Sequence, residues 1–211
     1  MAHIKASAGE IQGILTCFVN TNYMKNMLKL SRDINNEVKK SFFPIEIGFV
    51  ENESDINQII DLSMSHFGEY FSSIEECKMY YSSMVDYSIS IKASIGNKII
   101  GFYLLGDSDM LHAISQENLG ETDKEQKILD LQKSLIGKVG IHGVSLLVDP
   151  KYRKFGVATA MIEKSKNYPI DYIWGYAYKS LNNLDFWTKK QKREVAFQDK
   201  NFNWTIWRKE N

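Results

Sequence analysis

The residues best suited to bind a ligand follow a short apolar run at 144–148. A strand is predicted to end at Asp149-Pro150, because proline cannot donate to a sheet ladder. Two cations, a glycine and an apolar helical face come next: Arg153, Lys154, Gly156, Val157, Ala158, Met161 and Ile162. The start of a helix carries unpaired N–H groups and a positive dipole end, and glycine lets a ligand approach the backbone. The segment is therefore predicted to bind an anion, best a phosphate.

The order Arg-x-x-Gly-x-Ala after Val-Asp-Pro-x-Tyr resembles the pyrophosphate loop of the GCN5-related N-acetyltransferase (GNAT) superfamily, over residues 146–161. A nucleotide triphosphatase P-loop would need Gly-Lys-Ser/Thr after four spacers, which this segment lacks. Two alternatives remain open: an ordinary strand, turn and helix with surface cations, and a phosphate-binding protein of unrelated fold.

The elements that must position this loop are predicted from apolar periodicity and turn signals. They are a strand at 45–50, a helix that begins at Asn52 or Ser54, a helix after the capping box Ser72-x-x-Glu75, strands at 87–94 and 98–105 joined through Gly96-Asn97, a strand ending at 148, the loop and its helix, a strand at 172–178, a helix at 181–190, and strands at 194–198 and 203–207. This order resembles that of the superfamily. It implies an α/β (α+β layered) fold, with a mixed, mostly antiparallel central sheet of about six to seven strands and helices on both faces.

Residues 1–43 are predicted to form a mostly helical N-terminal extension, and residues 44–211 the GNAT-like domain. An insertion at 107–138 contains a predicted helix that begins at a capping box, Thr122-x-x-Glu125. Its apolar face should pack on the domain or on a second subunit, and consists of Ile128, Leu131 and Leu135. The insertion carries seven acidic and four basic side chains. It is either an acidic lid that favours a cationic acceptor or a solvated helix.

The resemblance implies an enzyme that moves an acetyl group from acetyl-CoA to a primary amine, by direct attack in a ternary complex. The strand before the loop would hold the pantetheine arm through its unpaired backbone, and one of its N–H groups would face the thioester oxygen. The loop would hold the pyrophosphate. The implied cofactor-binding residues are Leu146, Leu147, Val148, Arg153, Lys154, Phe155, Gly156, Val157, Ala158 and Thr159.

Transfer to an alkyl amine benefits from a general base, because only about 0.1% of such an amine is neutral at physiological pH. Where many family members have a glutamate and a tyrosine, this chain has Val144 and Trp187. Strand alternation places His142 on the face of Val144, Leu146 and Val148, so His142 is the candidate base. Its alternative is a core histidine bonded to a carbonyl. A carboxylate such as Glu69, or solvent, would then accept the proton.

Composition narrows the partners further. Lys+Arg and Asp+Glu both number 26, which argues against binding nucleic acid by bulk charge. No apolar run is long enough to span a bilayer, so no membrane partner is predicted. Four scattered histidines give no metal-ligand spacing. Two isolated cysteines, Cys17 and Cys77, suggest a cytoplasmic protein. The predicted partner is a small-molecule or peptide amine, with a homodimer as an option.

A second function stays open beside the enzyme. The chain could be a non-catalytic GNAT-like module that binds coenzyme A or a protein partner, an alternative that Val144 and Trp187 support. The basic run Lys189, Lys190, Lys192 and Arg193 has two interpretations as well. It is either a solvated face or a group of cations near the cofactor's phosphates.

Overall fold

The computed structural model describes residues 44–108, 110, 122–198 and 200–210, with the side chains of 122–125 left out. Contacts within the chain separate two units, Met1–Pro44 and Ile45–Asn211. The predicted helical extension at 1–43 lies outside the described residues. The architecture below is that of the second unit. No helix among the described residues is long and apolar enough to cross a membrane.

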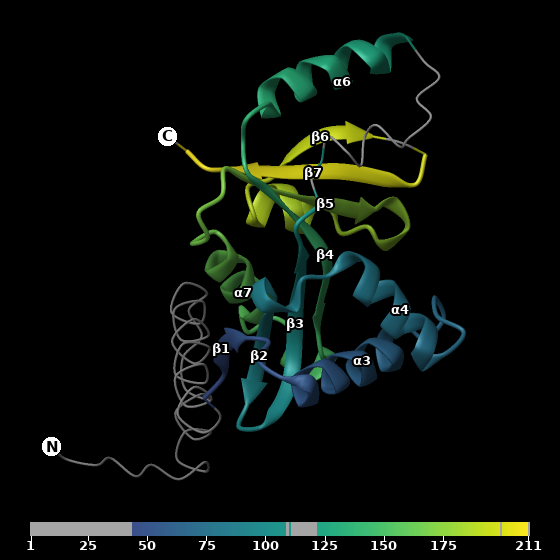
Figure 1. Cartoon of the computed structure of the whole chain (residues 1–211), viewed down its shortest axis with the longest axis vertical. Coiled ribbons are helices and arrows are strands. Elements are labelled where there is room, and N and C mark those ends of the chain that lie inside the picture. Colours follow the sequence, from purple (N-terminus) through teal and green to yellow (C-terminus); the bar gives the residue numbers. More distant parts are fainter. Residues whose placement is uncertain (1–43, 109, 111–121, 199, 211) are drawn as a thin grey trace, which may run out of the picture. The chain divides into compact units, whose positions relative to one another are not determined.

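A single seven-stranded sheet organises this unit (Figure 1). Its strands in spatial order are β1 (Glu46–Phe49), β2 (Ile91–Ile95), β3 (Lys98–Gly106), β4 (Gly140–Val148), β5 (Tyr172–Tyr178), β7 (Phe202–Arg208) and β6 (Glu194–Gln198). Every neighbouring pair is antiparallel except β4 and β5, which are parallel. The predicted mixed, mostly antiparallel sheet is confirmed.

Helices cover both faces of the sheet. On β3, alternate residues separate the layers: Tyr103 and Leu105 pack with helix α7 (Val157–Ser165), while Phe102 and Leu104 pack with α3 (Glu53–Phe67) and α4 (Ile74–Met84). On β5, Ile173 faces the α7 layer. The opposite face of β5 contacts α6 (Thr122–Leu135). Helices α3, α4 and α6 therefore share one face, and α7 covers the other.

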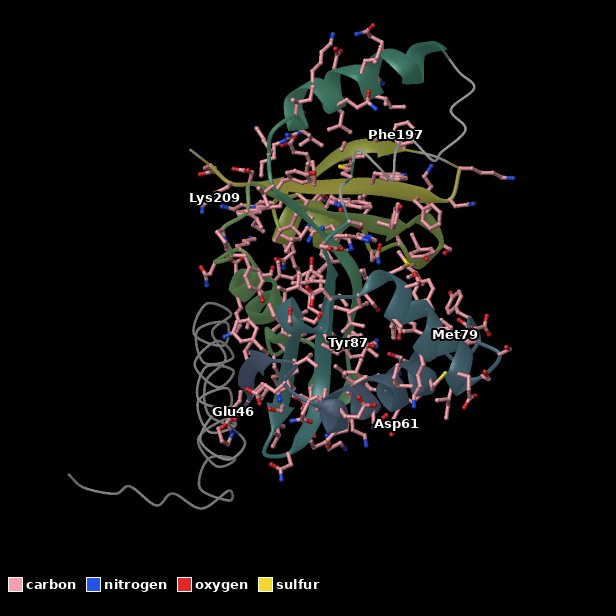
Figure 2. The ribbon with its side chains drawn as sticks, in the orientation of Figure 1. Glu46, Asp61, Met79, Tyr87, Phe197 and Lys209 are labelled. Atoms are coloured by element: carbon pink, nitrogen blue, oxygen red, sulfur yellow. The ribbon has the colours of Figure 1, made fainter. Side chains whose placement is uncertain are left out.

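The predicted apolar face of the insertion helix is confirmed. Ile128, Leu131 and Leu135 of α6 are buried against the β5–β7–β6 end of the sheet, in a cluster that includes Phe197 of β6 and two stacked indoles (Figure 2). An amphipathic helix gains stability by removing such a face from water. The side chains of the predicted cap, Thr122 and Glu125, lie outside the description.

Helix α4 begins one residue later than the predicted capping box. Ser73, rather than Ser72, is the N-cap, and its hydroxyl accepts a hydrogen bond from the N–H of Glu76. The Glu76 carboxylate in turn accepts from the backbone N–H and the hydroxyl of Ser72, both at 2.6 Å. Paired serines and paired glutamates fit either frame locally, so the sequence alone does not distinguish them.

Two predicted elements are shorter in the structure. The strand predicted at 87–94 begins only with β2, because Tyr87–Ile89 forms a 3₁₀ turn, η1, capped by Asp86. The helix predicted at 181–190 is divided into a 3₁₀ turn, η3 (Lys179–Leu181), and a π-helical turn, η4 (Phe186–Lys190). Asn182 between them has a left-handed φ of 47°, which interrupts a right-handed helix.

Candidate active site

The tight turn predicted between β4 and the helix that follows it is present in the loop after β4. Lys154 and Gly156 both have left-handed φ angles, 68° and 82°, which turn the chain into α7. The first helical bond runs from the N–H of Ala160 to the carbonyl of Gly156, at 2.9 Å. No side chain caps Gly156. The N–H groups of residues 157–159 thus precede the helical ladder at the positive end of the dipole.

Cations surround this helix start. Lys151, Arg153 and Lys154 are exposed, and Arg153 Nε donates to the carbonyl of Val148 at 2.9 Å, which fixes the guanidinium at the end of β4. Gln191 Nε2 donates to Thr159 Oγ1 at 3.1 Å, so the residues around the predicted basic run lie beside the first turn of α7. The arrangement can hold a phosphate through backbone N–H groups and several positive charges.

The sheet opens next to this loop. Strands β4 and β5, both fully described, pair only from Gly140↔Tyr172 to Gly143↔Gly175. Beyond the apex rung, the pair Gly143 and Gly175, β4 continues along β3 while β5 continues along β7 (Figure 1). The residues predicted to bind the pantetheine arm are Leu146, Leu147 and Val148. They pair with β3 along one edge of β4, and the other edge of β4 borders the opening.

A β-bulge at Val144 changes which residues of β4 share a face. The register with β3 shifts between Leu104 and Leu105, which oppose Ser145 and Gly143. Val144 packs with the α3 and α4 layer, whereas Leu146 and Val148 pack with the α7 layer. The prediction that His142, Val144, Leu146 and Val148 share one face is therefore wrong, because the bulge inserts one residue into the alternation.

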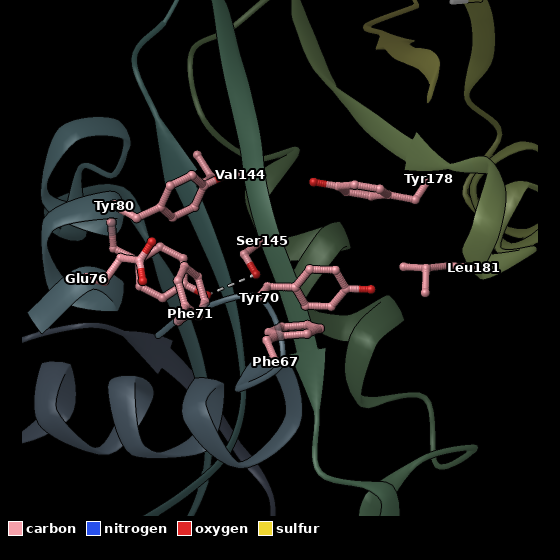
Figure 3. Close-up of a pocket in the computed structure, with 10 residues that line it drawn as sticks. Phe67, Tyr70, Phe71, Glu76, Tyr80, Val144, Ser145, Tyr178 and Leu181 are labelled. Carbon is pink, nitrogen blue, oxygen red and sulfur yellow. Dashed lines mark hydrogen bonds between the residues drawn. The ribbon is translucent and has the colours of Figure 1, made fainter. Parts of the chain in front are cut away.

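A pocket of about 270 Å³ lies where the opening meets the α4 face (Figure 3). Most of its lining is aromatic, and the residues are Phe67, Tyr70, Phe71, Glu76, Tyr80, Tyr81, Val144, Ser145, Tyr178 and Leu181. We call it the aromatic pocket. Tyr178, at the end of β5, extends toward β4, and Tyr81 from α4 donates to Ser145 Oγ on β4 at 3.5 Å. The pocket thus bridges the two strands that separate.

The pocket is electrostatically suited to a cation. Burial raises the pKa of Tyr80, Tyr81 and Tyr178, so these phenols stay protonated and present neutral rings and hydroxyls. The hydroxyl and N–H of Ser72 lower the pKa of Glu76, the carboxylate among the lining residues, so it carries a negative charge. Aromatic faces and a carboxylate both attract an ammonium group.

Solved structures share this architecture. PH1933 from Pyrococcus horikoshii OT3 superposes with a TM-score of 0.57 at 16% identity, over 79% of this chain and 99% of that one. Polyamine N-acetyltransferase from Drosophila melanogaster gives 0.53 at 10% identity, over 78% and 99%. The GNAT family N-acetyltransferase YhbS from Escherichia coli, solved with CoA, gives 0.50 at 15% identity, over 79% and 82%. The chain has the GNAT fold. No family model and no curated protein sequence matches it.

Within this GNAT fold, His142 lies behind the pocket rather than in its lining. Its side chain is 2% exposed and stacks on Trp174 at 4.0 Å between ring centroids. Burial, followed by the charge of Arg193, lowers the pKa of His142 to about 4, so the imidazole is neutral. Neither ring nitrogen has a partner in the described part of the chain. The alternative prediction, that His142 bonds to a backbone carbonyl, is wrong. A role as general base would require a path for the proton from the amine to the imidazole.

The glycines on either side of His142 leave no space for a ligand. A Cβ on Gly140 would collide with the ring of Tyr172, and one on Gly143 would collide with the hydroxyl of Tyr103. These glycines admit neighbouring tyrosines, not a ligand or a water chain. Glu69, the alternative proton acceptor, is exposed and lies outside the pocket lining.

Sequence reasoning missed the aromatic pocket and the burial of Arg193. The signal for the pocket is present in the sequence as five aromatic residues between positions 67 and 81. For Arg193 no local signal exists, since it belongs to a basic run whose lysines at 189, 190 and 192 are all exposed. Its side chain is only 4% exposed.

Proposed function

We propose that this protein is an acyl-CoA-dependent N-acetyltransferase that moves an acetyl group from acetyl-CoA to a primary amine. The observation that carries the proposal is the opening between β4 and β5. It joins an anion-binding loop at the end of β4 to the aromatic pocket on the α4 face. An extended thioester anchored by its phosphates can enter the sheet there, because β4 and β5 stop pairing after Gly143 and Gly175 while each stays paired with its other neighbour.

The residues fit a coenzyme A molecule in three places. Residues 153–159 offer helix N–H groups and cations to the pyrophosphate. The open edge of Leu146, Leu147 and Val148 offers backbone groups to the amides of the arm. One N–H group near the bulge at Val144 would meet the oxyanion that forms when the thioester is attacked. No metal is part of the proposal.

The acceptor amine is proposed to enter through the aromatic pocket. An ammonium group would be attracted by Glu76 and by the ring faces of Tyr80 and Tyr178, and would then lose its proton. Since an alkyl amine has a pKa near 10.4, forming the neutral amine costs about 4 kcal/mol at physiological pH. Solvent at the pocket mouth is the proposed proton acceptor. The Drosophila enzyme, which catalyses the formation of N-acetylagmatine, supports a cationic amine as substrate.

A direct test is release of free thiol from acetyl-CoA with a panel of amines: agmatine, a diamine, an arylalkylamine and a short peptide with a free N-terminus. We expect turnover with at least one cationic amine. Coenzyme A binding without turnover on any amine would favour the second candidate, a non-catalytic module, which Val144 and Trp187 support. Absence of coenzyme A binding would refute the enzyme and would leave only a module that binds a protein partner.

Two further proposals concern the cellular location and the oligomeric state of the protein. The protein is proposed to act in the cytoplasm, with Cys77 as a buried free thiol in support. A homodimer stays a prediction that sedimentation of the full chain would test.

A further inference from the structure

Arg193 is a buried cation without an anionic partner in the described part of the chain. Its Nη2 donates to the hydroxyl of Tyr103 at 2.7 Å, and its Cζ lies 4.4 Å from the ring centroid of Trp187. Its Nε has no acceptor among the described residues. No carboxylate of these residues forms an ion pair with it; the described ion pairs of arginine involve only Arg208.

Such a charge is costly to bury. A guanidinium removed from water needs a carboxylate, a phosphate or several hydrogen bonds in compensation. One phenol and one indole face supply only part of this. The folded protein therefore retains an unused capacity to bind negative charge at this position.

Arg193 is placed at the apex rung. Its Nη1 lies 3.5 Å from the position that a Cβ on Gly175 would occupy, and Tyr103 Oη lies against Gly143 in the same way. The two glycines that end the β4–β5 pairing thus leave space for the guanidinium and the phenol. Because Tyr103 belongs to the α7 layer, this pair lies on the α7 side of the opening.

Other buried polar groups without partners lie in or near η4, the turn that precedes Arg193. In the described part of the chain they are Trp187 Nε1, Gln191 Oε1 and Asn183 Oδ1. Trp187 is 8% exposed and Gln191 is 1% exposed. These buried donors and acceptors belong to or adjoin η4, beside the opening, which indicates that a polar ligand completes the site.

Resting on the proposed function, we propose that Arg193 is a catalytic residue that stabilises the coenzyme A thiolate as it leaves. The nitrogen lone pair of the neutral amine forms the C–N bond to the thioester carbon. The C–S bond breaks, its electron pair stays on sulfur, and the thiolate pairs with the guanidinium. The proton of the acylated nitrogen passes to solvent, so no further reactant is needed.

This assignment explains how the chain can act without a proton donor at Trp187. An indole N–H is not an acid at neutral pH. A guanidinium held at this position can stabilise the thiolate directly instead of protonating it. The titratable groups that interact with Arg193 are Tyr103, through a hydrogen bond, and His142, through its charge effect alone; His142 is neutral, so it neither competes for the thiolate nor adds charge.

The test counts the protons released when the full chain binds coenzyme A. Calorimetry at pH 7.5 in two buffers of different ionisation enthalpy gives this number, and desulfo-coenzyme A, which lacks the thiol, gives the background. A free thiol with a pKa near 8.5 is about one-tenth ionised at this pH. A cation in contact lowers a thiol pKa by at least about one pH unit, so coenzyme A should release about 0.4 of a proton or more beyond desulfo-coenzyme A.

Variants assign the effect to Arg193. Arg193→Gln should abolish the extra proton and lower kcat at least about 100-fold, with a change in KM for acetyl-CoA of only a few fold. Arg193→Lys keeps a charge and should restore part of both. Arg208→Gln, on β7 and paired with Glu194, is the matched control and should change neither.

The outcomes separate the two proposals. If neither ligand binds the unaltered protein, the proposed function is wrong. If both bind with equal proton release, the proposed function stands and the role of Arg193 is overturned; this comparison needs no variant to fold. An Arg193→Gln protein that folds and releases as many protons as the unaltered protein also overturns it.

Discussion

The imidazole of His142 lies flat on the indole of Trp174, with 4.0 Å between the ring centroids and 8° between the ring planes. This stack has a consequence for acid stability. Burial and the charge of Arg193 lower the pKa of His142 to about 4, against about 6.5 when unfolded. Between these values the unfolded chain binds a proton that the folded chain does not, so the stability is complete above pH 6.5 and is lost as the pH falls toward 4.

We therefore expect the free energy of unfolding to drop by about 3 kcal/mol from this group between pH 6.5 and pH 4. His142→Phe keeps a ring on Trp174 but cannot titrate, so this component should vanish. Urea unfolding at a series of pH values measures it. An unchanged pH dependence in the variant would contradict the pKa shift. Turnover of the same variant tests His142 as base: full activity from pH 6 to 9 excludes that role.

The loop proposed to bind an anion predicts a difference between two glycines. Gly156 and Gly137 both have left-handed φ, 82° and 74°, and a Cβ on either would meet nothing within 4 Å. Valine at either position should cost about 1–2 kcal/mol of stability through backbone strain. Only Gly156→Val should also weaken coenzyme A binding, by at least about tenfold, because it distorts the start of α7. Calorimetry and thermal unfolding separate the two effects, and equal affinities in both variants would refute the site.

The aromatic pocket predicts a charge preference. Glu76→Gln should raise KM for a cationic amine about two- to fivefold with little change in kcat, since an exposed ion pair contributes modestly to binding. Glu75→Gln, one residue earlier on α4 and outside the lining, is the control. Raising the salt concentration should reduce the difference between the variants. Equal KM values at low salt would exclude Glu76 from acceptor binding.

The insertion helix predicts a stability difference within α6. Leu135 is 1% exposed and Leu129 is 47% exposed. Leu135→Ala should lower the free energy of unfolding by about 2–5 kcal/mol, because it leaves a cavity over the β5–β7–β6 end of the sheet. Leu129→Ala should change it by no more than about 0.5 kcal/mol. If the two variants unfold alike, α6 does not contribute to the folded core.

The parts of the fold that sequence predicted well are those with local causes. Pro150 ends a strand and Gly156 begins a helix through their own backbone preferences, so the loop was predictable from a few residues. The frame of the α4 cap was not, because Ser72 and Ser73 have equal local preference. The bulge at Val144 and the burial of Arg193 depend on pairing with β3 and β5, partners far away in sequence. The apolar periodicity of the sequence around Val144 or around Arg193 predicts neither feature.

The positions of the four tryptophans allow the protein to be followed by its intrinsic optical signals, without an added label. The rings of Trp174 and Trp204 stack beneath α6, with 5.7 Å between the ring centroids and 7° between the ring planes. Such a pair should give a coupled signal in near-ultraviolet circular dichroism that reports on the α6 layer. Trp187 lies under a guanidinium beside the opening in the sheet. Its fluorescence should respond to whatever enters there, so one unlabelled sample can follow folding and ligand entry separately.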